Sequence, residues 1–162
     1  FNHIFGNTFE IPEAIINDDE SIPGIDGRKM SKSYNNVIPL LGSDKKLKKS
    51  IMKIVTNSLE PGEPKDFNDC TVFELYKYFA DVDEINEFKT AYKDGISWGD
   101  AKDKLFNIIN AELLPIRSKY EDLINDPDYL NDVLGDGAKK ARTLAKEKIE
   151  KVKEVIGLTK IS

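Results

Sequence analysis

The sequence contains one cysteine and one histidine, so it cannot form an internal disulfide or a zinc-type cluster of these residues. It has no Asn-x-Ser/Thr glycosylation acceptor, and no run of about 18 apolar residues that would form a membrane-spanning helix. These absences predict a cytoplasmic protein in a reducing compartment, with no membrane attachment. The chain begins at Phe1 without an initiator methionine, and we expect it to be part of a longer protein.

What the sequence does contain is typical of a globular protein: 162 residues, 40% hydrophobic and 33% charged, with a net charge of −5. The charge is distributed in blocks, with −6 over residues 1–26, +7 over 27–56, −11 over 57–136 and +5 over 137–162. The two basic blocks indicate local anion-binding surfaces on an acidic protein. The alternative is that the lysines of both blocks are only solvated on helix faces and bind no anion. The charge pattern alone does not decide between these two interpretations.

The first 70 residues alternate between extended, turn and helical signals. Residues 8–12 form a short alternating run after Gly6, which predicts a strand. Residues 21–27 contain two glycines and a proline, which predicts a loop or a very short strand between turns. Ser43 or Asp44 can begin a helix that continues to about Val55. Prolines, a glycine and acidic residues then mark residues 57–70 as a linker.

Beyond residue 70 the sequence has helical periodicity almost throughout, interrupted by N-cap residues and glycines. Five helices are expected. The first begins with a Thr71–Glu74 capping box, the second begins at Asp81 or Asp83 and ends at Gly95, and the third is a long helix that begins at Ser97. The fourth is a short helix from Asp126 to Gly135, and the last runs from about Gly137 to Ile156.

The residues best suited to chemistry are the sequence Lys29-Met30-Ser31-Lys32-Ser33, which follows a glycine-rich stretch. Two ammonium groups three residues apart, with serine hydroxyls between and beside them, suit the oxygens of a polyphosphate. Glycines on the N-terminal side would let such a loop close over its ligand. The residues themselves therefore predict a phosphate-binding loop.

This pentapeptide resembles the signature loop of class I aminoacyl-tRNA synthetases at all five positions. Its surroundings resemble the tryptophanyl-tRNA synthetases, in Phe1-Asn2-His3, Phe9 to Glu13, Pro23 to Arg28, Tyr34-Asn35-Asn36, Ile38-Pro39-Leu40 and Ile51 to Thr56. The resemblance extends over nearly the whole chain but covers only the C-terminal half of the family's catalytic protein. The ATP-binding motif of the first half and the acidic residue that binds the tryptophan amine are not in this sequence.

The resemblance implies that ATP activates tryptophan, which is then transferred to tRNA(Trp). It implies that Lys32 is the main stabiliser of the pyrophosphate leaving group and that Lys29 assists it. Ser31 and Ser33 would supply hydroxyl or backbone donors, and Met30 would anchor the loop against apolar neighbours. The stretch around Ile22 would lie along the adenine. Mg²⁺ would bridge the phosphates without requiring ligands from this chain.

The helical region resembles the family's anticodon-recognition domain. The last helix carries a basic face that would follow the tRNA backbone, with Lys139, Lys140, Arg142 and Lys146 as the expected contacts. That these side chains are only solvated is the alternative. The resemblance also implies a homodimer in the full-length protein.

The expected fold is mainly α. Residues 1–56 would be the remnant of an α/β Rossmann-type catalytic domain with one or two short strands, residues 57–70 a linker, and residues 71–162 an α-helical anticodon-binding domain. By itself the chain is expected to be inactive, because it lacks half of the nucleotide-binding sheet.

Three alternatives remain open at this stage. The chain can belong to a tyrosyl-tRNA synthetase, because the two families share their architecture and the specificity residues are missing here. It can be a non-catalytic module that binds tRNA or dimerises. The acidic run Asp18-Asp19-Glu20 is expected to be a solvated loop, with a Mg²⁺ site as the weaker interpretation.

Overall fold

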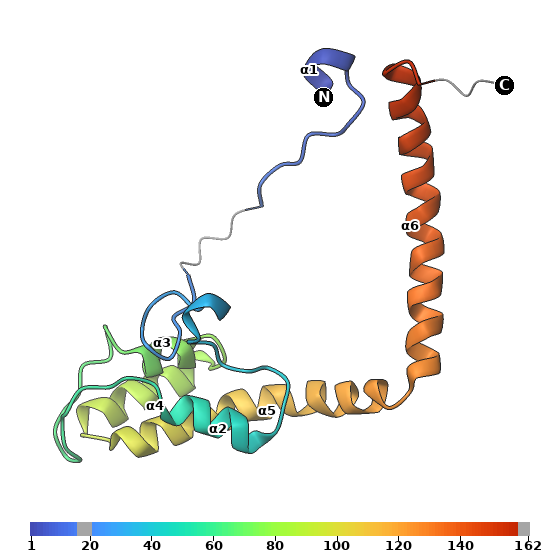
Figure 1. Ribbon diagram of the computed structural model, residues 1–162. Helices are drawn as coiled ribbons and strands as arrows, with labels where there is room; N and C mark the ends of the chain where they lie inside the picture. The colour runs from blue at the N-terminus through green and yellow to red at the C-terminus, as the bar shows by residue number, and fades with distance from the viewer. Residues whose placement is uncertain (16–20, 159–162) are drawn as a thin grey trace. The chain divides into compact units, whose positions relative to one another are not determined.

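A computed structural model describes residues 1–15 and 21–158 and is predominantly helical (Figure 1). Its α-helices are α1 (Asn2–Phe5), α2 (Asp44–Met52), α3 (Thr71–Lys77), α4 (Val82–Lys93), α5 (Trp98–Ile124) and α6 (Pro127–Val155), and Lys32–Tyr34 form a short 3-10 helix, η1. The chain divides into two compact units, one formed by Phe1–Asp18 with Asp122–Ser162 and the other by Asp19–Glu121. This division describes packing, and the functional domain boundaries stay a prediction.

The mainly helical fold class is confirmed, with one correction in the N-terminal segment. Within the described residues, the only sheet-type pairing is an isolated antiparallel bridge between Pro23 and Lys29, and the strand expected at residues 8–12 does not form. Side chains bind its backbone instead. The Asn2 amide accepts from the N–H of Phe9 at 2.9 Å and donates to its carbonyl at 2.6 Å, and Lys148 Nζ donates to the Thr8 carbonyl at 3.0 Å. An alternating pattern makes a strand only where another strand pairs with it.

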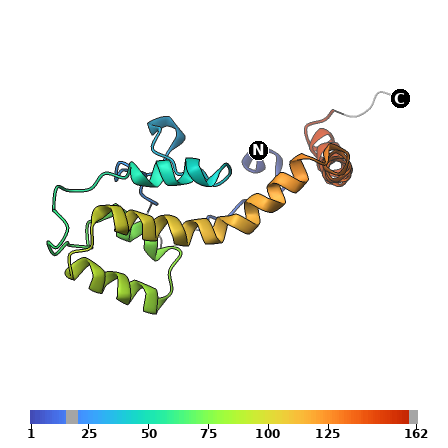
Figure 2. The same ribbon diagram turned by 90° about the horizontal axis from the view of Figure 1, so that it is seen from below.

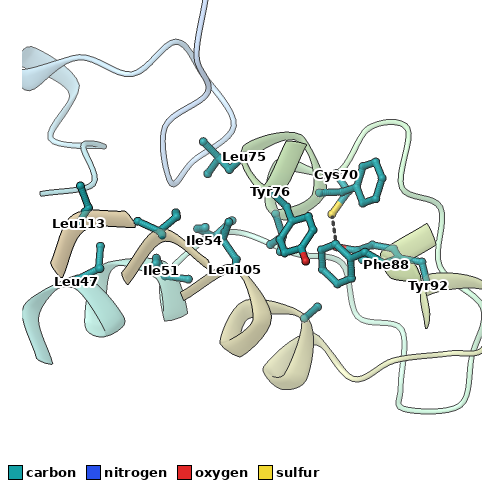
Figure 3. Close-up of a cluster of buried hydrophobic side chains, with 14 residues drawn as sticks. Leu47, Ile51, Ile54, Cys70, Leu75, Tyr76, Phe88, Tyr92, Leu105 and Leu113 are labelled. Carbon is teal, nitrogen blue, oxygen red and sulfur yellow. Dashed lines mark hydrogen bonds between the residues drawn. The ribbon is translucent and has the colours of Figure 1, made fainter. Parts of the chain in front are cut away.

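The larger unit is built around an apolar core between α2 and α5 (Figure 3). Leu47 and Ile51 of α2, together with Ile54 just after it, are almost completely buried. They share this core with buried α5 residues that recur every four positions, Leu105, Ile109 and Leu113. In Figure 2, α2 lies alongside the first part of α5. Helix α2 ends at Met52, three residues before the end predicted at about Val55, and Val55 is exposed.

Aromatic rings make up the other end of the same core, where α3 meets α4. Phe88 of α4 packs against Tyr76 of α3 at 4.3 Å between ring centroids, and against Tyr92 at 4.8 Å, edge to face. The Tyr92 hydroxyl lies 3.3 Å from the buried Cys70 thiol, and burial raises the pKa of this phenol. Trp98 packs against Tyr92 and donates from Nε1 to the Asn57 side chain at 3.0 Å. Cys70 and Trp98 are thus packing residues.

Most helix starts lie where the capping residues predicted them. Asp81 and Glu84 form a reciprocal capping box at α4, and Asp126 accepts from the Tyr129 N–H at α6. The predicted Thr71–Glu74 box is wrong, because Thr71 is already the first helical residue and Cys70 occupies the N-cap position. A capping side chain must belong to the residue before the first helical turn.

The two helices expected at the C-terminus are in fact one. Helix α6 runs without interruption through Gly135 and Gly137, and neither glycine has a positive φ. A glycine ends a helix only when its backbone turns left-handed, as at Gly157, whereas a glycine that keeps helical dihedrals weakens the helix by about 1 kcal/mol. In the described residues, no helix is both long and apolar enough to cross a membrane.

The contact between Gly95 and Gly62 provides a test of the packing in the larger unit. Both glycines have positive φ, and Gly62 donates its N–H to the Gly95 carbonyl at 2.8 Å. A Cβ on Gly95 would lie 2.4 Å from the Gly62 carbonyl carbon, whereas a Cβ on Gly62 would meet nothing within 4 Å. Gly62→Ala is therefore the matched control, since it introduces the backbone strain without the collision.

We expect Gly62→Ala to lower the free energy of unfolding by about 1–2 kcal/mol. Gly95→Ala should lower it by about 1–3 kcal/mol more, because the backbone must move apart. Urea denaturation followed by the fluorescence of Trp98, the only tryptophan in the chain, measures both. Equal losses for the two variants would contradict the close contact.

Candidate functional site

The residues before the predicted phosphate-binding loop fold back on themselves. Gly24 donates its N–H to the Arg28 carbonyl at 2.7 Å, and Met30 donates to the Ile22 carbonyl at 2.8 Å. Gly27 closes the turn by donating to the Gly24 carbonyl at 2.9 Å, and its φ of 81° is one that glycine adopts without strain. The predicted loop at residues 21–27 is therefore a tight hairpin-like turn.

The tip of the loop is the 3-10 turn η1. The Ser31 hydroxyl oxygen accepts from the Ser33 N–H at 3.3 Å and lies 2.7 Å from the Ser33 hydroxyl. Asn35 adopts the left-handed conformation and donates its N–H to the Lys32 carbonyl at 3.1 Å. Of the five residues, Lys29 lies in the bridge with Pro23, Ser31 caps the turn, and Lys32 and Ser33 belong to the turn itself.

Both lysines of the loop present their ammonium groups to solvent. Lys29 and Lys32 are exposed, and neither forms an ion pair within residues 1–15 and 21–158. Cationic side chains on an ordered turn, next to two hydroxyls, match the donor set that a polyphosphate requires. Such a set binds anionic oxygens rather than a metal ion.

One polar side chain lies inside the loop. Asn36 is only 1% exposed, and its carboxamide accepts from the Ser31 N–H at 2.8 Å. Its Nδ2 donates to Asp26 Oδ1 at 2.7 Å and to the Lys29 carbonyl at 3.1 Å. A Cβ on Gly24 would lie 2.3 Å from this Nδ2, so the backbone there can approach only because residue 24 is glycine.

Asp26 joins this amide to the surface of the loop. Arg28 donates to Asp26 Oδ2 from Nε at 2.8 Å and from Nη2 at 2.7 Å, and its guanidinium carbon lies 4.7 Å from the Tyr34 ring centroid. Hydrogen bonds from Asn36 first, and then from Arg28, lower the pKa of Asp26 below its ordinary value of 3.8. The hydrogen bonds to the ionised carboxylate therefore stabilise the loop at neutral pH, and this contribution is lost as the pH falls through the lowered pKa of Asp26.

The loop is attached to the helical core on its inner side. Ile25 accepts from the Val55 N–H at 2.9 Å, which ties the turn to the end of α2. Beneath the loop is an apolar cavity of about 510 Å³, lined by Ile22, Met30, Lys32, residues 37–40, Leu75, Tyr78, Phe79 and Ile109. Half-buried Met30 lies against this apolar wall, where the sequence predicted that it anchors the loop. Ile22 lines the same cavity.

The predicted RNA contacts lie on α6, which belongs to the other packing unit. Lys139, Lys140, Arg142 and Lys146 are all exposed. Lys139 pairs with Asp136 at 3.1 Å, an exposed contact that competes weakly with a phosphate. Lys148 differs from them, because its Nζ binds the Thr8 carbonyl and lies 5.7 Å from the Phe9 ring centroid.

Two residues of the site were not predicted from the sequence, Asn36 and Asp26. Asparagine after the loop and aspartate before it are common turn residues, so no local pattern predicts their contact across ten positions. The acidic run Asp18-Asp19-Glu20 lies outside the described residues. Among the described residues, no three His, Cys, Asp or Glu side chains are grouped as a metal site.

The whole chain is similar in sequence to known proteins. The tryptophan–tRNA ligase of Neisseria meningitidis serogroup A is 46% identical to the chain over 159 residues, which are 98% of this chain and 47% of that protein. The tryptophan–tRNA ligase of Pseudomonas aeruginosa is 44% identical over 162 residues, with 98% of this chain and 36% of that protein covered. The chain thus spans about half, or less, of the length of these relatives.

Solved structures are similar as well. The crystal structure of tryptophanyl-tRNA synthetase from Campylobacter jejuni complexed with ADP and tryptophan has a TM-score of 0.87 and 40% identity, covering 97% of this chain and 50% of that one. A second structure of the Campylobacter enzyme has a TM-score of 0.82 at the same identity. Residues 1–114 match the model of the family described as tRNA synthetases class I (W and Y). With most of its length inside that match, the chain belongs to the class I tRNA synthetases of the tryptophan and tyrosine family.

Proposed function

We propose that this chain is the C-terminal part of a tryptophan–tRNA ligase, which activates tryptophan with ATP and transfers it to tRNA(Trp). The observation that carries the proposal is the ordered loop with two exposed ammonium groups, Lys29 and Lys32, that have no ion-pair partner in the described residues. The names of the curated relatives support tryptophan over tyrosine. The ADP and tryptophan in the Campylobacter structure support an adenine nucleotide and tryptophan as the ligands here.

In the proposed reaction the carboxylate of tryptophan attacks the α-phosphate of ATP, and pyrophosphate leaves. Negative charge then grows on the β- and γ-phosphates, where Lys32 is the main stabilising group and Lys29 assists. The hydroxyls of Ser31 and Ser33 add neutral donors. The stretch around Ile22, on the wall of the apolar cavity, would lie along the adenine. Mg²⁺ would be held by the phosphates, because the loop offers cationic donors and no carboxylate beside its lysines.

The remaining parts of the proposal concern partners and organisation. Residues 1–56 would complete the catalytic domain, residues 57–70 would be the linker, and residues 71–162 would recognise the anticodon. Lys139, Lys140, Arg142 and Lys146 would contact tRNA phosphates. The full-length protein would be a cytoplasmic homodimer. A non-catalytic tRNA-binding or dimerising module is the competing interpretation, and the exposed lysines of the loop count against it.

The isolated chain should not catalyse tryptophan-dependent exchange of pyrophosphate into ATP. It spans half or less of the ligases it matches, and a nucleotide-binding sheet that is half missing cannot hold ATP. The assay compares the purified 162-residue chain with the full-length protein. Measurable exchange by the isolated chain would contradict this expectation.

In the full-length protein, Lys32→Ala should lower the kcat of adenylate formation by about 100-fold or more, because it removes an interaction that strengthens in the transition state. The KM for ATP should change little, and Lys29→Ala should have a smaller effect. Lys93→Ala is the matched control, an exposed lysine on α4 remote in sequence from the loop. Parallel losses of kcat and ATP affinity would show that Lys32 only holds the substrate.

Replacing Lys139, Lys140 and Lys146 together with Ala should weaken the binding of cognate and non-cognate tRNA alike, because phosphates carry no sequence information. The slope of log affinity against log salt should flatten by roughly 0.7–0.9 for each phosphate that the variant no longer neutralises. Adenylate formation should not change.

The control for that variant is a triple substitution with the same change in charge, at the exposed lysines Lys77, Lys93 and Lys104 of α3, α4 and α5. Salt titrations of tRNA binding compare the two variants with the parent. If both triple variants bind like the parent with the same salt slope, the basic face of α6 is only solvated.

A further inference from the structure

The side chain of Asn36 is placed where it can control both lysines of the loop. Its Nδ2 donates to the carbonyl of Lys29, and its Oδ1 accepts from the N–H of Ser31. The carboxamide therefore holds the main chain on both sides of Met30. Lys29 is held directly, and Lys32 follows Ser31, whose side chain caps the turn that contains it.

The hydrogen bonds of this carboxamide stay within the loop. Besides Lys29 and Ser31, Nδ2 binds Asp26, and it lies 3.4 Å from the Arg28 carbonyl. None of these partners belongs to α2, α3, α4 or α5, whose apolar residues make the core. A change at Asn36 should therefore alter the geometry of the loop more than the packing of the helices.

The other bonds of the region fix the position of the amide. The backbone carbonyl of Asn36 accepts from the Ile25 N–H at 3.0 Å, and Ile25 in turn accepts from Val55 beyond α2. Gly24 packs directly against the carboxamide, leaving no space for even one further carbon. The hydrogen bonds of Ile25 and the contact with Gly24 thus hold the buried amide in place. The side chains of the two lysines, whose backbone depends on this amide, are exposed.

We propose that Asn36 is a positioning residue for adenylate formation, which holds the backbone of Lys29 and Ser31 so that Lys32 reaches the phosphates in a productive geometry. This inference rests on the proposed function. A displacement of about 1 Å in a group that stabilises a transition state can lower a rate by about 100-fold, so removal of a backbone hydrogen bond should be visible in kcat.

The test uses Asn36→Asp in the full-length protein, because Asp has nearly the same shape and can still accept from Ser31. It cannot donate to the Lys29 carbonyl, and its charge faces Asp26. Asn68→Asp is the matched control: Asn68 also donates from Nδ2 to an aspartate, Asp66 Oδ1 at 2.8 Å, but it lies in the linker. Asn36→Ser is the second variant, which removes the carboxamide without adding a charge and remains informative if Asn36→Asp does not fold.

Tryptophan-dependent ATP–pyrophosphate exchange should show kcat lowered by about 10- to 100-fold in Asn36→Asp and Asn36→Ser, with the KM for ATP within about threefold of the parent. Asn68→Asp should keep both constants within about twofold. In a Lys32→Ala background the same Asn36 substitutions should lower kcat by less than about threefold, because the group that they misplace is already gone. A purely structural role for Asn36 would give the full loss in both backgrounds.

The outcomes separate the two proposals. Suppose that Lys32→Ala lowers kcat while the Asn36 variants keep the parent kcat, or that the losses in kcat from the Lys32 and Asn36 substitutions multiply in the double variants. The positioning role is then wrong, and the proposed function stands. If the parent protein shows no tryptophan-dependent exchange, or Lys32→Ala is as active as the parent, the proposed function fails in this form and the positioning role fails with it.

Discussion

A buried carboxamide needs a hydrogen-bond partner for each of its polar atoms, and this requirement organises the loop of this protein. Asn36 finds its partners in the main chain at Lys29 and Ser31 and in the carboxylate of Asp26. The chain must therefore fold back around one side chain. Gly24 follows from the same requirement, because a side chain at this position would occupy the space of the amide.

The loop combines a hydrogen-bonded base with an exposed tip. Its base is joined to the helical core through the bond between Ile25 and Val55, and α2 is held by the apolar contacts that it shares with α5. Lys29 and Lys32 extend from this base into solvent. The proposed phosphate binding would benefit from this arrangement, since a backbone held by hydrogen bonds lowers the entropy lost on binding while the long side chains can still adjust.

Helix α6 differs from the helices of the core in the burial of its side chains. None of its residues is buried within the described part of the chain, and two glycines weaken its interior. Local terms contribute to its stability, among them the Asp126 cap, proline at the first helical position and ion pairs such as Lys139 with Asp136, and Lys148 adds a contact with the Thr8 carbonyl. The four basic residues predicted to contact tRNA, Lys139, Lys140, Arg142 and Lys146, are all exposed.

The sequence alone determined the features that depend on contacts between residues close together in the chain. Asp81 and Asp126 cap their helices because the partners lie within one turn, and Lys29 to Ser33 predict a phosphate-binding loop because the donors are contiguous. Only the tertiary structure decided which segments find distant partners. Residues 8–12 form no strand because side chains take their backbone hydrogen bonds, and Asn36 becomes the centre of the site because folding brings Asp26 and Gly24 against it. Burial and pairing across the chain depend on the whole fold, which no local pattern encodes.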